Sequence, residues 1–464
     1  MSSDLHYLSL DEVARRLKAR KLSSVEATKV ILARIDTLDP KLKAYAIVTR
    51  DRALADAKAR DAETAAGKSR GPLHGVPIAV KDLCNTEGVP TAGGMAIHRG
   101  NVPVKDATVV ARLKQAGAVI LGKLQMTEGA FGAHHPSIPA PLNPWNATYW
   151  TGSSSSGSGS ATAAGLCFGS LGSDTGGSIR FPSTMNGLSG MKPTWGRVSR
   201  AGVFALADSL DHIGPMTRSS LDAAIMLGVI AGADADDPTA VPLAVPDYAG
   251  SIGAGVRGKR IGLPTNMTDV DADSQSALDG AVKALRAAGA EIVDIALPGD
   301  FNNGSRDWVA LCAIETALAH EATYPSRAAE YGPVLAGLIE MGHRLSGLEI
   351  ARLQLRRAAL TGGLNKLLAG LDLLLMPVMG RAVWSLDALA AGGRDPESVA
   401  ARLRYTAPFD LSGHPTLTLP GGMSKDGVPT GFQIVSRAFD EATILAAGHA
   451  YQQSTDWHLK RPPL

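Results

Sequence analysis

The stretch Gly152-Ser-Ser-Ser-Ser-Gly157-Ser-Gly-Ser-Ala-Thr-Ala-Ala-Gly165 decides how the chain folds around it. Its first half has the composition of a flexible linker. Apolar, helix-compatible residues follow at 161–164 and 166–168, which a linker would not contain. The pattern therefore predicts a glycine-rich loop that opens a buried helix. Backbone N–H groups at such a helix start can bind a negatively charged group.

Outward from this helix, short apolar segments of β type alternate with helical patterns. The β-type segments are 77–80, 118–121, 259–264, 291–295, 371–376, 415–420 and 431–435. This alternation predicts an α/β fold in which one mixed, mostly parallel, twisted sheet is covered by helices on both faces. The glycines between the last two segments predict a hairpin.

No Pro- or Ser-rich linker divides the chain, so one large domain over 1–464 is expected. Two S-x-x-E capping boxes indicate an N-terminal helical segment over 1–70. The core that carries the motifs spans 71–220. Residues 305–370 show a helical pattern and are expected to form a cap-like region.

The charge of the chain is balanced, with 46 Lys and Arg against 44 Asp and Glu. This balance argues against a basic surface for nucleic acid. No apolar run reaches the ~18 residues that span a bilayer, and the N-terminal residues do not resemble a secretory signal. Three cysteines without a CxxC spacing fit a reducing compartment. We therefore expect a cytoplasmic protein with no nucleic-acid or membrane partner.

Familiar cofactor and protease motifs are absent around the glycine-rich loop. Ser158 stands where a phosphate-binding P-loop needs Lys, and Gly157-x-Gly159 lacks the third glycine of a dinucleotide loop. Asp174-Thr-Gly176 matches the aspartic-protease tripeptide, but the sequence has no second copy. Neither a G-x-S-x-G elbow nor an HExxH spacing occurs. The sequence therefore predicts no cofactor and no metal.

A second small-residue turn, Asp174-Thr-Gly-Gly-Ser178, indicates a different chemistry. Its glycine pair lets successive N–H groups converge, and converging N–H groups stabilise an oxyanion. Ser178 ends the turn, and no histidine lies nearby in sequence to act as its base. Lys81 follows the apolar run 77–80, where burial would lower its pKa and let it act as a base. From this local pattern alone, an ion pair between Lys81 and a carboxylate stays an open alternative.

These segments resemble the amidase signature family. The resemblance rests on three stretches: Gly71-Pro-Leu-His-Gly-Val-Pro-Ile-Ala-Val-Lys81-Asp82, Gly152-Ser-Ser-Ser-Ser-Gly157 and Asp174-Thr-Gly-Gly-Ser-Ile-Arg-Phe-Pro-Ser183. Further similar segments are 122–128, 192–199, 211–215 and 427–433. The resemblance is weakest over 305–370. Ser153 departs from the pattern, because the family prefers Gly or Ala there, before a serine that follows a cis peptide bond.

The resemblance implies a Ser–cisSer–Lys triad. Ser178 would attack an amide carbonyl, Ser154 would relay the proton, and Lys81 would accept it. Asp174 and Arg180 would brace the turn through hydrogen bonds and an ion pair. The oxyanion hole would consist of the backbone N–H groups of Thr175, Gly176, Gly177 and Ser178.

The resemblance also implies hydrolysis of the C–N bond of small amides. Because the irregular stretch 128–151 contains several aromatic residues, we expect aryl amides, anilides or carbamates as substrates. The expected substrate-binding residues are Gln125, Met126, Trp145 and Tyr149. Two alternatives stay open: the A subunit of the glutamyl-tRNA amidotransferase, which is a glutaminase, and a non-catalytic binding protein on the same fold. A monomer or homodimer is expected.

Overall fold

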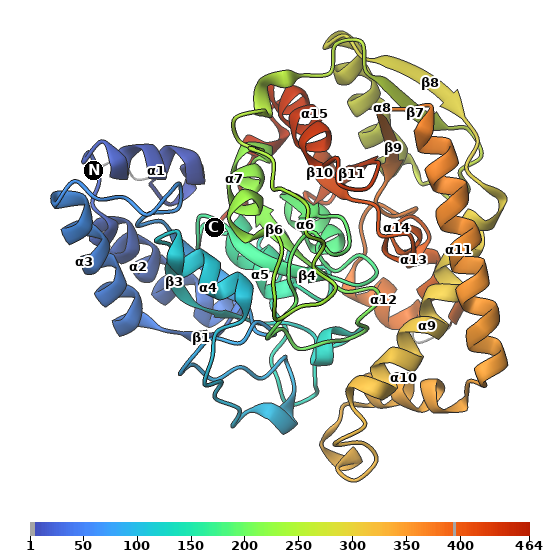
Figure 1. The fold of residues 1–464 in the computed structure, drawn as a ribbon, viewed down its shortest axis with the longest axis horizontal. Coiled ribbons are helices and arrows are strands. Elements are labelled where there is room, and N and C mark those ends of the chain that lie inside the picture. Colours follow the sequence, from blue (N-terminus) through green and yellow to red (C-terminus); the bar gives the residue numbers. More distant parts are fainter. Residues whose placement is uncertain (1–4, 393–395) are drawn as a thin grey trace.

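The computed structural model describes residues 5–392 and 396–464. At its centre lies an 11-stranded sheet with the order β1-β3-β2-β4-β6-β5-β10-β11-β9-β7-β8, flanked by helices (Figure 1). The strands are β1 (Tyr45–Val48), β2 (Pro77–Lys81), β3 (Val119–Leu124), β4 (Ser170–Asp174), β5 (Ser189–Lys192), β6 (His212–Thr217), β7 (Arg260–Pro264), β8 (Glu291–Ile295), β9 (Leu373–Pro377), β10 (Thr416–Met423) and β11 (Pro429–Ser436).

The α-helices are α1 (Leu10–Lys18), α2 (Ser24–Leu42), α3 (Arg50–Ala65), α4 (Thr108–Gln115), α5 (Ser156–Ala163), α6 (Arg180–Asn186), α7 (Ser220–Ile230), α8 (Ala272–Ala287), α9 (Gly304–Ala319), α10 (Pro333–Arg344), α11 (Gly347–Ala369), α12 (Leu386–Gly392), α13 (Pro396–Leu403), α14 (Ala407–Leu411) and α15 (Glu441–Gln453). The described ranges also contain the short 3-10 helices η1 (Leu5–Tyr7), η2 (Ala96–His98), η3 (Glu128–Ala130), η4 (Ile252–Ala254), η5 (Gly299–Asn303), η6 (Ala328–Glu330) and η7 (Trp457–Leu459). Over the described ranges, no helix has the length and apolar character needed to cross a membrane.

The directions of the strands correct part of the prediction. The sheet is mixed, as predicted, but among the described strands the antiparallel neighbours outnumber the parallel ones. Parallel pairing occurs where a helical crossover joins the strands, as between β2 and β3 or between β7 and β8. The strands β4, β6, β5, β10, β11 and β9 pair antiparallel with one another along the middle of the sheet. A fully buried strand is an unbroken run of apolar residues whether it pairs parallel or antiparallel with its neighbours. The sequence pattern therefore does not reveal the direction of the strand. The predicted hairpin of β10 and β11 is confirmed.

The N-terminal segment is not helical throughout. A complete capping box at Ser23 and Glu26 starts α2, as the pattern predicts. Strand β1 follows α2 and pairs with β3 at one edge of the sheet. Residues 1–70 therefore contribute a strand to the central sheet as well as helices. Strand β1 is an apolar segment of only four residues, too short to stand out against the helical pattern around it.

The predicted buried helix is α5, and all of its residues are buried. It begins inside the glycine- and serine-rich stretch and ends at Ala163, so the apolar residues 166–168 lie beyond it. It packs against α6 and lies close to β2, β3, β4 and β6. A Cβ atom on Gly157 would lie 2.4 Å from the carbonyl oxygen of Ala44 and 2.6 Å from the backbone nitrogen of Gln125. The small residues of this segment therefore allow a helix to fit where neighbouring backbone approaches closely.

The predicted helical region 305–370 consists mainly of α9, α10 and α11. These helices lie on the side of the molecule away from α1, α2 and α3 (Figure 1). Helix α9 packs against α10, α11, α13 and α14. It therefore joins this region to the C-terminal segments that reach the centre of the molecule.

Candidate active site

Lys81 ends strand β2 with its side chain fully buried. Its Nζ lies 2.6 Å from Ser154 Oγ, 2.9 Å from Ser155 Oγ and 2.7 Å from Ser173 Oγ. Within the described ranges, no carboxylate lies at ion-pair distance from this amine. The adjacent Asp82 instead approaches Lys123, at 3.8 Å. The structure thus favours the hydroxyl contacts over the alternative ion pair of Lys81.

Burial lowers the pKa of Lys81 to about 7. The charged form loses hydration in this site, and no acidic partner close by compensates for that loss. A large fraction of the amine is therefore neutral near pH 7. A neutral amine that contacts a serine hydroxyl can accept its proton.

Ser154 and Ser178 come from two neighbouring loops. Ser154 precedes α5, and the Ser153–Ser154 peptide bond is cis. Ser178 follows β4 and is partly exposed, whereas Gly177 and Ile179 beside it are buried. The backbone N–H of Ser155 donates to the carbonyl oxygen of Ser178 at 3.3 Å. The structure thus brings Lys81 and Ser154 into direct contact and joins the Ser178 loop to theirs.

The turn predicted to hold an oxyanion is fixed by the carboxylate of Asp174. Gly177 N–H donates to Asp174 Oδ1 at 2.6 Å, so this predicted oxyanion donor is already occupied. Gly177 has a φ of 138°, and a Cβ there would lie 2.5 Å from the ring of Phe181. For the N–H groups of Thr175, Gly176 and Ser178, no acceptor occurs among the described residues. Three of the four predicted donors therefore remain free for an oxyanion.

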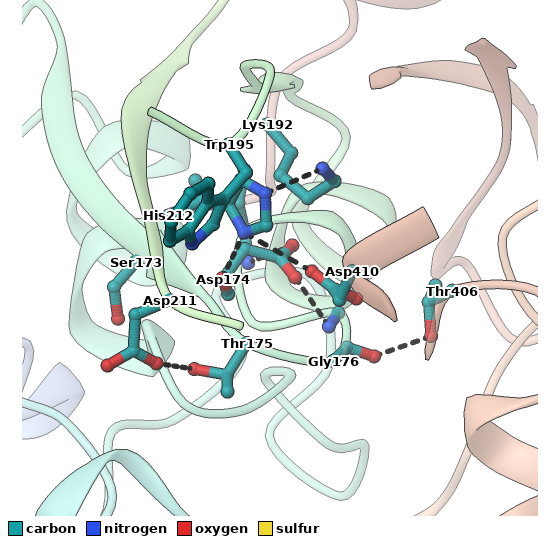
Figure 2. Close-up of polar contacts among 12 residues, drawn as sticks. Ser173, Asp174, Thr175, Gly176, Lys192, Trp195, Asp211, His212, Thr406 and Asp410 are labelled. Carbon is teal, nitrogen blue, oxygen red and sulfur yellow. Dashed lines mark hydrogen bonds and ion pairs between the residues drawn. The ribbon is translucent and has the colours of Figure 1, made fainter. Parts of the chain in front are cut away.

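A buried cluster of charges lies behind this turn, and Figure 2 shows part of it. Arg180 contacts Asp174 through two hydrogen bonds, at 2.9 and 3.0 Å, and also donates to Asp410. Burial alone would raise the pKa of Asp174, but the charge and hydrogen bonds of Arg180 hold it below its ordinary value. Asp174 and Arg180 thus lie where the sequence analysis expected them, with Asp410 as a third member.

Thr406, His212 and Trp308 contact backbone carbonyls of the turn, and sequence reasoning did not identify them. Thr406 Oγ1 donates to the carbonyl oxygen of Gly176 at 2.6 Å. His212 Nδ1 lies 3.1 Å from the carbonyl oxygen of Asp174 (Figure 2). Trp308 Nε1 donates to the carbonyl oxygen of Thr175 at 2.5 Å. His212 lies in a segment that resembles the family, but no sequence signal marks Thr406 or Trp308.

A cavity of about 550 Å³ opens beside the turn, and Ser153, Gly176 and Ser178 lie in its wall. Aliphatic side chains from α10, α12 and α13 form much of the remainder. The aromatic part of the wall consists of Phe131, Trp150, Phe181 and Trp308. A mostly apolar cavity with a few polar groups at one end is typical of a small-molecule site.

Two polar side chains of the cavity lie near this end. His134 and Ser156 both line it, and His134 Nε2 lies 3.0 Å from Ser156 Oγ. Burial lowers the pKa of His134 to about 4. The imidazole is therefore neutral near pH 7 and offers a hydrogen bond without a charge.

The four predicted substrate-binding residues do not line this cavity. Met126 is fully buried in the core, and Gln125 Oε1 accepts from the backbone of Met126 at 3.2 Å. Trp145 Nε1 donates to the carbonyl oxygen of Asn186. Tyr149 donates to Asp426 at 2.6 Å. Side chains of an irregular loop point in directions that its composition does not reveal, and of the predicted aromatic loop it is Trp150 that reaches the cavity.

Comparisons with known proteins agree with this geometry. The family model described as Amidase matches residues 26–445. A protein of Mycobacterium tuberculosis named "Putative amidase AmiD" is 50% identical over 464 residues, which cover 98% of this chain and 96% of that protein. The A subunit of the glutamyl-tRNA(Gln) amidotransferase of Geobacter metallireducens is 38% identical, and 99% of each chain is covered.

A solved structure, described as a bacterial aryl acylamidase of the amidase signature family, superimposes with a TM-score of 0.88. It is 26% identical, and the match covers 99% of this chain and 100% of that one. Sequence and fold therefore agree over nearly the whole length. The chain belongs to the amidase signature family.

Proposed function

We propose that this protein hydrolyses the C–N bond of small amides that carry an aryl or other large apolar group, through an acyl-enzyme on Ser178. The contact of the buried Lys81 amine with Ser154, beside the Ser178 turn, carries this proposal. The cavity that opens at Ser178 gives an amide access to that hydroxyl.

In the proposed first half-reaction, Ser178 Oγ attacks the carbonyl carbon, and its proton passes through Ser154 Oγ to Lys81 Nζ. The tetrahedral oxyanion accepts hydrogen bonds from the free N–H groups of the turn, chiefly Gly176 and Ser178. The C–N bond then breaks, and the proton returns through Ser154 to the nitrogen of the leaving amine. The products of this stage are the free amine and an ester of Ser178.

In the second half-reaction, a water molecule gives its proton to Lys81 by the same route and attacks the ester. The C–O bond to Ser178 breaks, the carboxylic acid leaves, and the serine hydroxyl regains its proton. A carbamate would follow the same steps. If the C–N bond of the carbamate breaks first, the acyl-enzyme is a carbonate ester of Ser178. If the C–O bond breaks first, it is a carbamate ester of Ser178.

The apolar, partly aromatic wall supports the proposed substrate class. Phe131, Trp150 and Trp308 offer ring surfaces to an aryl group, and the volume fits a ring with a short acyl chain. The neutral His134 supplies one hydrogen-bonding group. The structural similarity to the aryl acylamidase also supports an aryl amide as substrate. We extend the proposal to a cytoplasmic location, which the buried, free cysteines support. We also extend it to a monomer or homodimer.

One observation favours a second candidate function. The similarity to the A subunit of the glutamyl-tRNA(Gln) amidotransferase extends over the whole chain. In that role, the chain would hydrolyse glutamine to supply ammonia. A polar amide such as glutamine would find few partners on the largely apolar wall, so the amide hydrolase is preferred.

The test is release of the amine from 4-nitroacetanilide, ethyl N-phenylcarbamate and glutamine by the purified protein. Turnover of the aryl compounds, with little of glutamine, is expected. A fluorophosphonate probe should label the protein at Ser178. Ser178→Ala should abolish turnover and labelling, and Ser154→Ala and Lys81→Ala should lower turnover at least a hundredfold.

The exposed Ser326, whose hydroxyl donates to the carbonyl oxygen of Thr323 in its own turn, provides the matched control Ser326→Ala. This variant should keep full activity. Glutamine turnover in preference to both aryl compounds would favour the second function. Absence of both turnover and labelling would leave a binding protein as the better description.

A further inference from the structure

We infer that Trp308 is a positioning residue for the oxyanion hole: its indole N–H holds the Thr175–Gly176 peptide so that Gly176 N–H faces the reacting carbonyl. This inference rests on the proposed hydrolysis at Ser178. Trp308 belongs to α9, in the part of the chain where the family resemblance is weakest. Its side chain is almost wholly buried, and Nε1 donates to the carbonyl oxygen of Thr175 at 2.5 Å.

The first step of the argument is the geometry of a planar trans peptide. Its carbonyl and N–H point in opposite directions, so a fixed carbonyl also fixes the N–H. The Thr175 carbonyl points to Trp308, which directs the N–H of Gly176 the other way. That N–H has no acceptor among the described residues, and Gly176 lies in the cavity wall beside Ser178. A buried donor without a partner is available to a substrate oxygen.

The second step is steric. A Cβ atom on Gly176 would lie 2.5 Å from Cζ2 and 2.6 Å from Cε2 of Trp308. The indole therefore packs directly on this peptide and obstructs its rotation. The side chain of Thr175 is fixed as well, because its hydroxyl donates to Asp211 Oδ1 at 2.5 Å. Donors that are held in place before the reaction need no reorganisation when the oxyanion forms.

The third step separates Trp308 from the other anchors. Thr406 holds the next carbonyl, that of Gly176, and the N–H of that peptide is already used by Asp174. His212 contacts the carbonyl oxygen of Asp174, and the N–H of that peptide belongs to Thr175. Trp308 is thus the anchor of the peptide that carries the free N–H of Gly176. The same indole lines the cavity, so one side chain contacts the substrate and orients the oxyanion donor.

The test replaces Trp308 by Phe, which keeps an aromatic wall but removes the N–H. The matched control is Trp195→Phe, because Trp195 Nε1 also donates to a backbone carbonyl, at 3.3 Å, and lies outside the cavity. With 4-nitroacetanilide, Trp308→Phe should lower kcat about 10- to 100-fold and change KM less than about threefold. Binding of an aryl trifluoromethyl ketone, whose adduct carries an oxyanion, should weaken in parallel with kcat/KM. The control should match the wild type in both.

A site-specific benzothienylalanine at position 308 keeps the shape of the indole without its N–H, and it should reproduce the loss if Trp308→Phe proves unstable. Wild-type kcat in either variant, or a change in KM alone, would overturn the inference while leaving the hydrolase intact. By contrast, a wild-type protein that neither turns over the anilide nor reacts with the fluorophosphonate would refute the proposed function itself.

Discussion

The pKa of Lys81 makes the activity depend on pH in a way that can be calculated. Burial lowers this pKa from an ordinary 10.5 to about 7, which corresponds to about 5 kcal/mol of disfavoured charge. If the neutral amine is the base, kcat/KM follows the neutral fraction. That fraction rises from about 9% at pH 6 to about 91% at pH 8, so we expect a roughly tenfold increase.

The assay is the rate of 4-nitroaniline release at low substrate concentration across pH 5 to 10, where kcat/KM reports the free enzyme. The rate of fluorophosphonate labelling of Ser178 gives a second profile that does not depend on an amine leaving group. Both should have a midpoint near pH 7. His134 does not interfere, because burial lowers its pKa to about 4, below the range of interest.

Two results would refute this reasoning. A profile that is flat from pH 6 to 8 would mean that no group with this pKa controls the reaction. A midpoint above pH 9 would mean that the lysine keeps its ordinary pKa. Lys81→Ala provides the internal check, since its residual labelling should no longer change with pH over this range.

Three further predictions concern stability and selectivity. Lys81→Met should be inactive, yet its free energy of unfolding in urea at pH 7 should be about 1–3 kcal/mol higher than that of the wild type. The substitution removes the cost of burying the amine, and the loss of the hydrogen bonds of Lys81 offsets only part of this stabilisation. Between pH 7 and 10.5 the unfolded wild-type chain binds more protons than the folded one, so the stability of the wild type should rise over this window. The difference in unfolding free energy between Lys81→Met and the wild type should therefore shrink. A difference that stays constant from pH 7 to 10.5 would contradict the lowered pKa of Lys81. Arg180→Ala leaves Asp174 and Asp410 buried without their cation and should lower the free energy of unfolding by about 3–5 kcal/mol, measured by denaturant titration; a loss below about 1 kcal/mol would show that the cluster is not held by this ion pair. Val334→Trp narrows the cavity and should raise KM for 4-nitroacetanilide about tenfold while leaving acetamide turnover within about twofold; equal effects on both amides would place the aryl group elsewhere.

The site residues that can be predicted from the sequence are those that lie in short, local motifs. Lys81 ends a recognisable apolar strand, and Ser154 and Ser178 lie in turns whose composition is hard to explain otherwise. Burial of Lys81 and Ser154 follows from the apolar and small residues around them. Lys81 and the Ser178 turn come close because the adjacent strands β2 and β4 carry them to the same place in the sheet.

The parts that could not be predicted depend on contacts between distant segments. Trp308 and Thr406 reach the oxyanion turn from helices and loops more than a hundred residues away, and neither lies in a characteristic motif. The occupied N–H of Gly177 follows from the exact direction of one carboxylate, that of Asp174. Likewise, only the backbone path decides that Trp150, and not Trp145, faces the cavity.

The order in which these segments leave the ribosome has its own consequence. Lys81, Ser154 and Ser178 are all made early, whereas Thr406 and Asp410, which hold the turn through Gly176 and Arg180, are made late. Until α14 docks, a nascent chain has Ser178 but lacks the contacts of Thr406 and Asp410 that hold the turn around it. We therefore expect the proposed hydrolytic activity only from chains made through α14, near the end of synthesis.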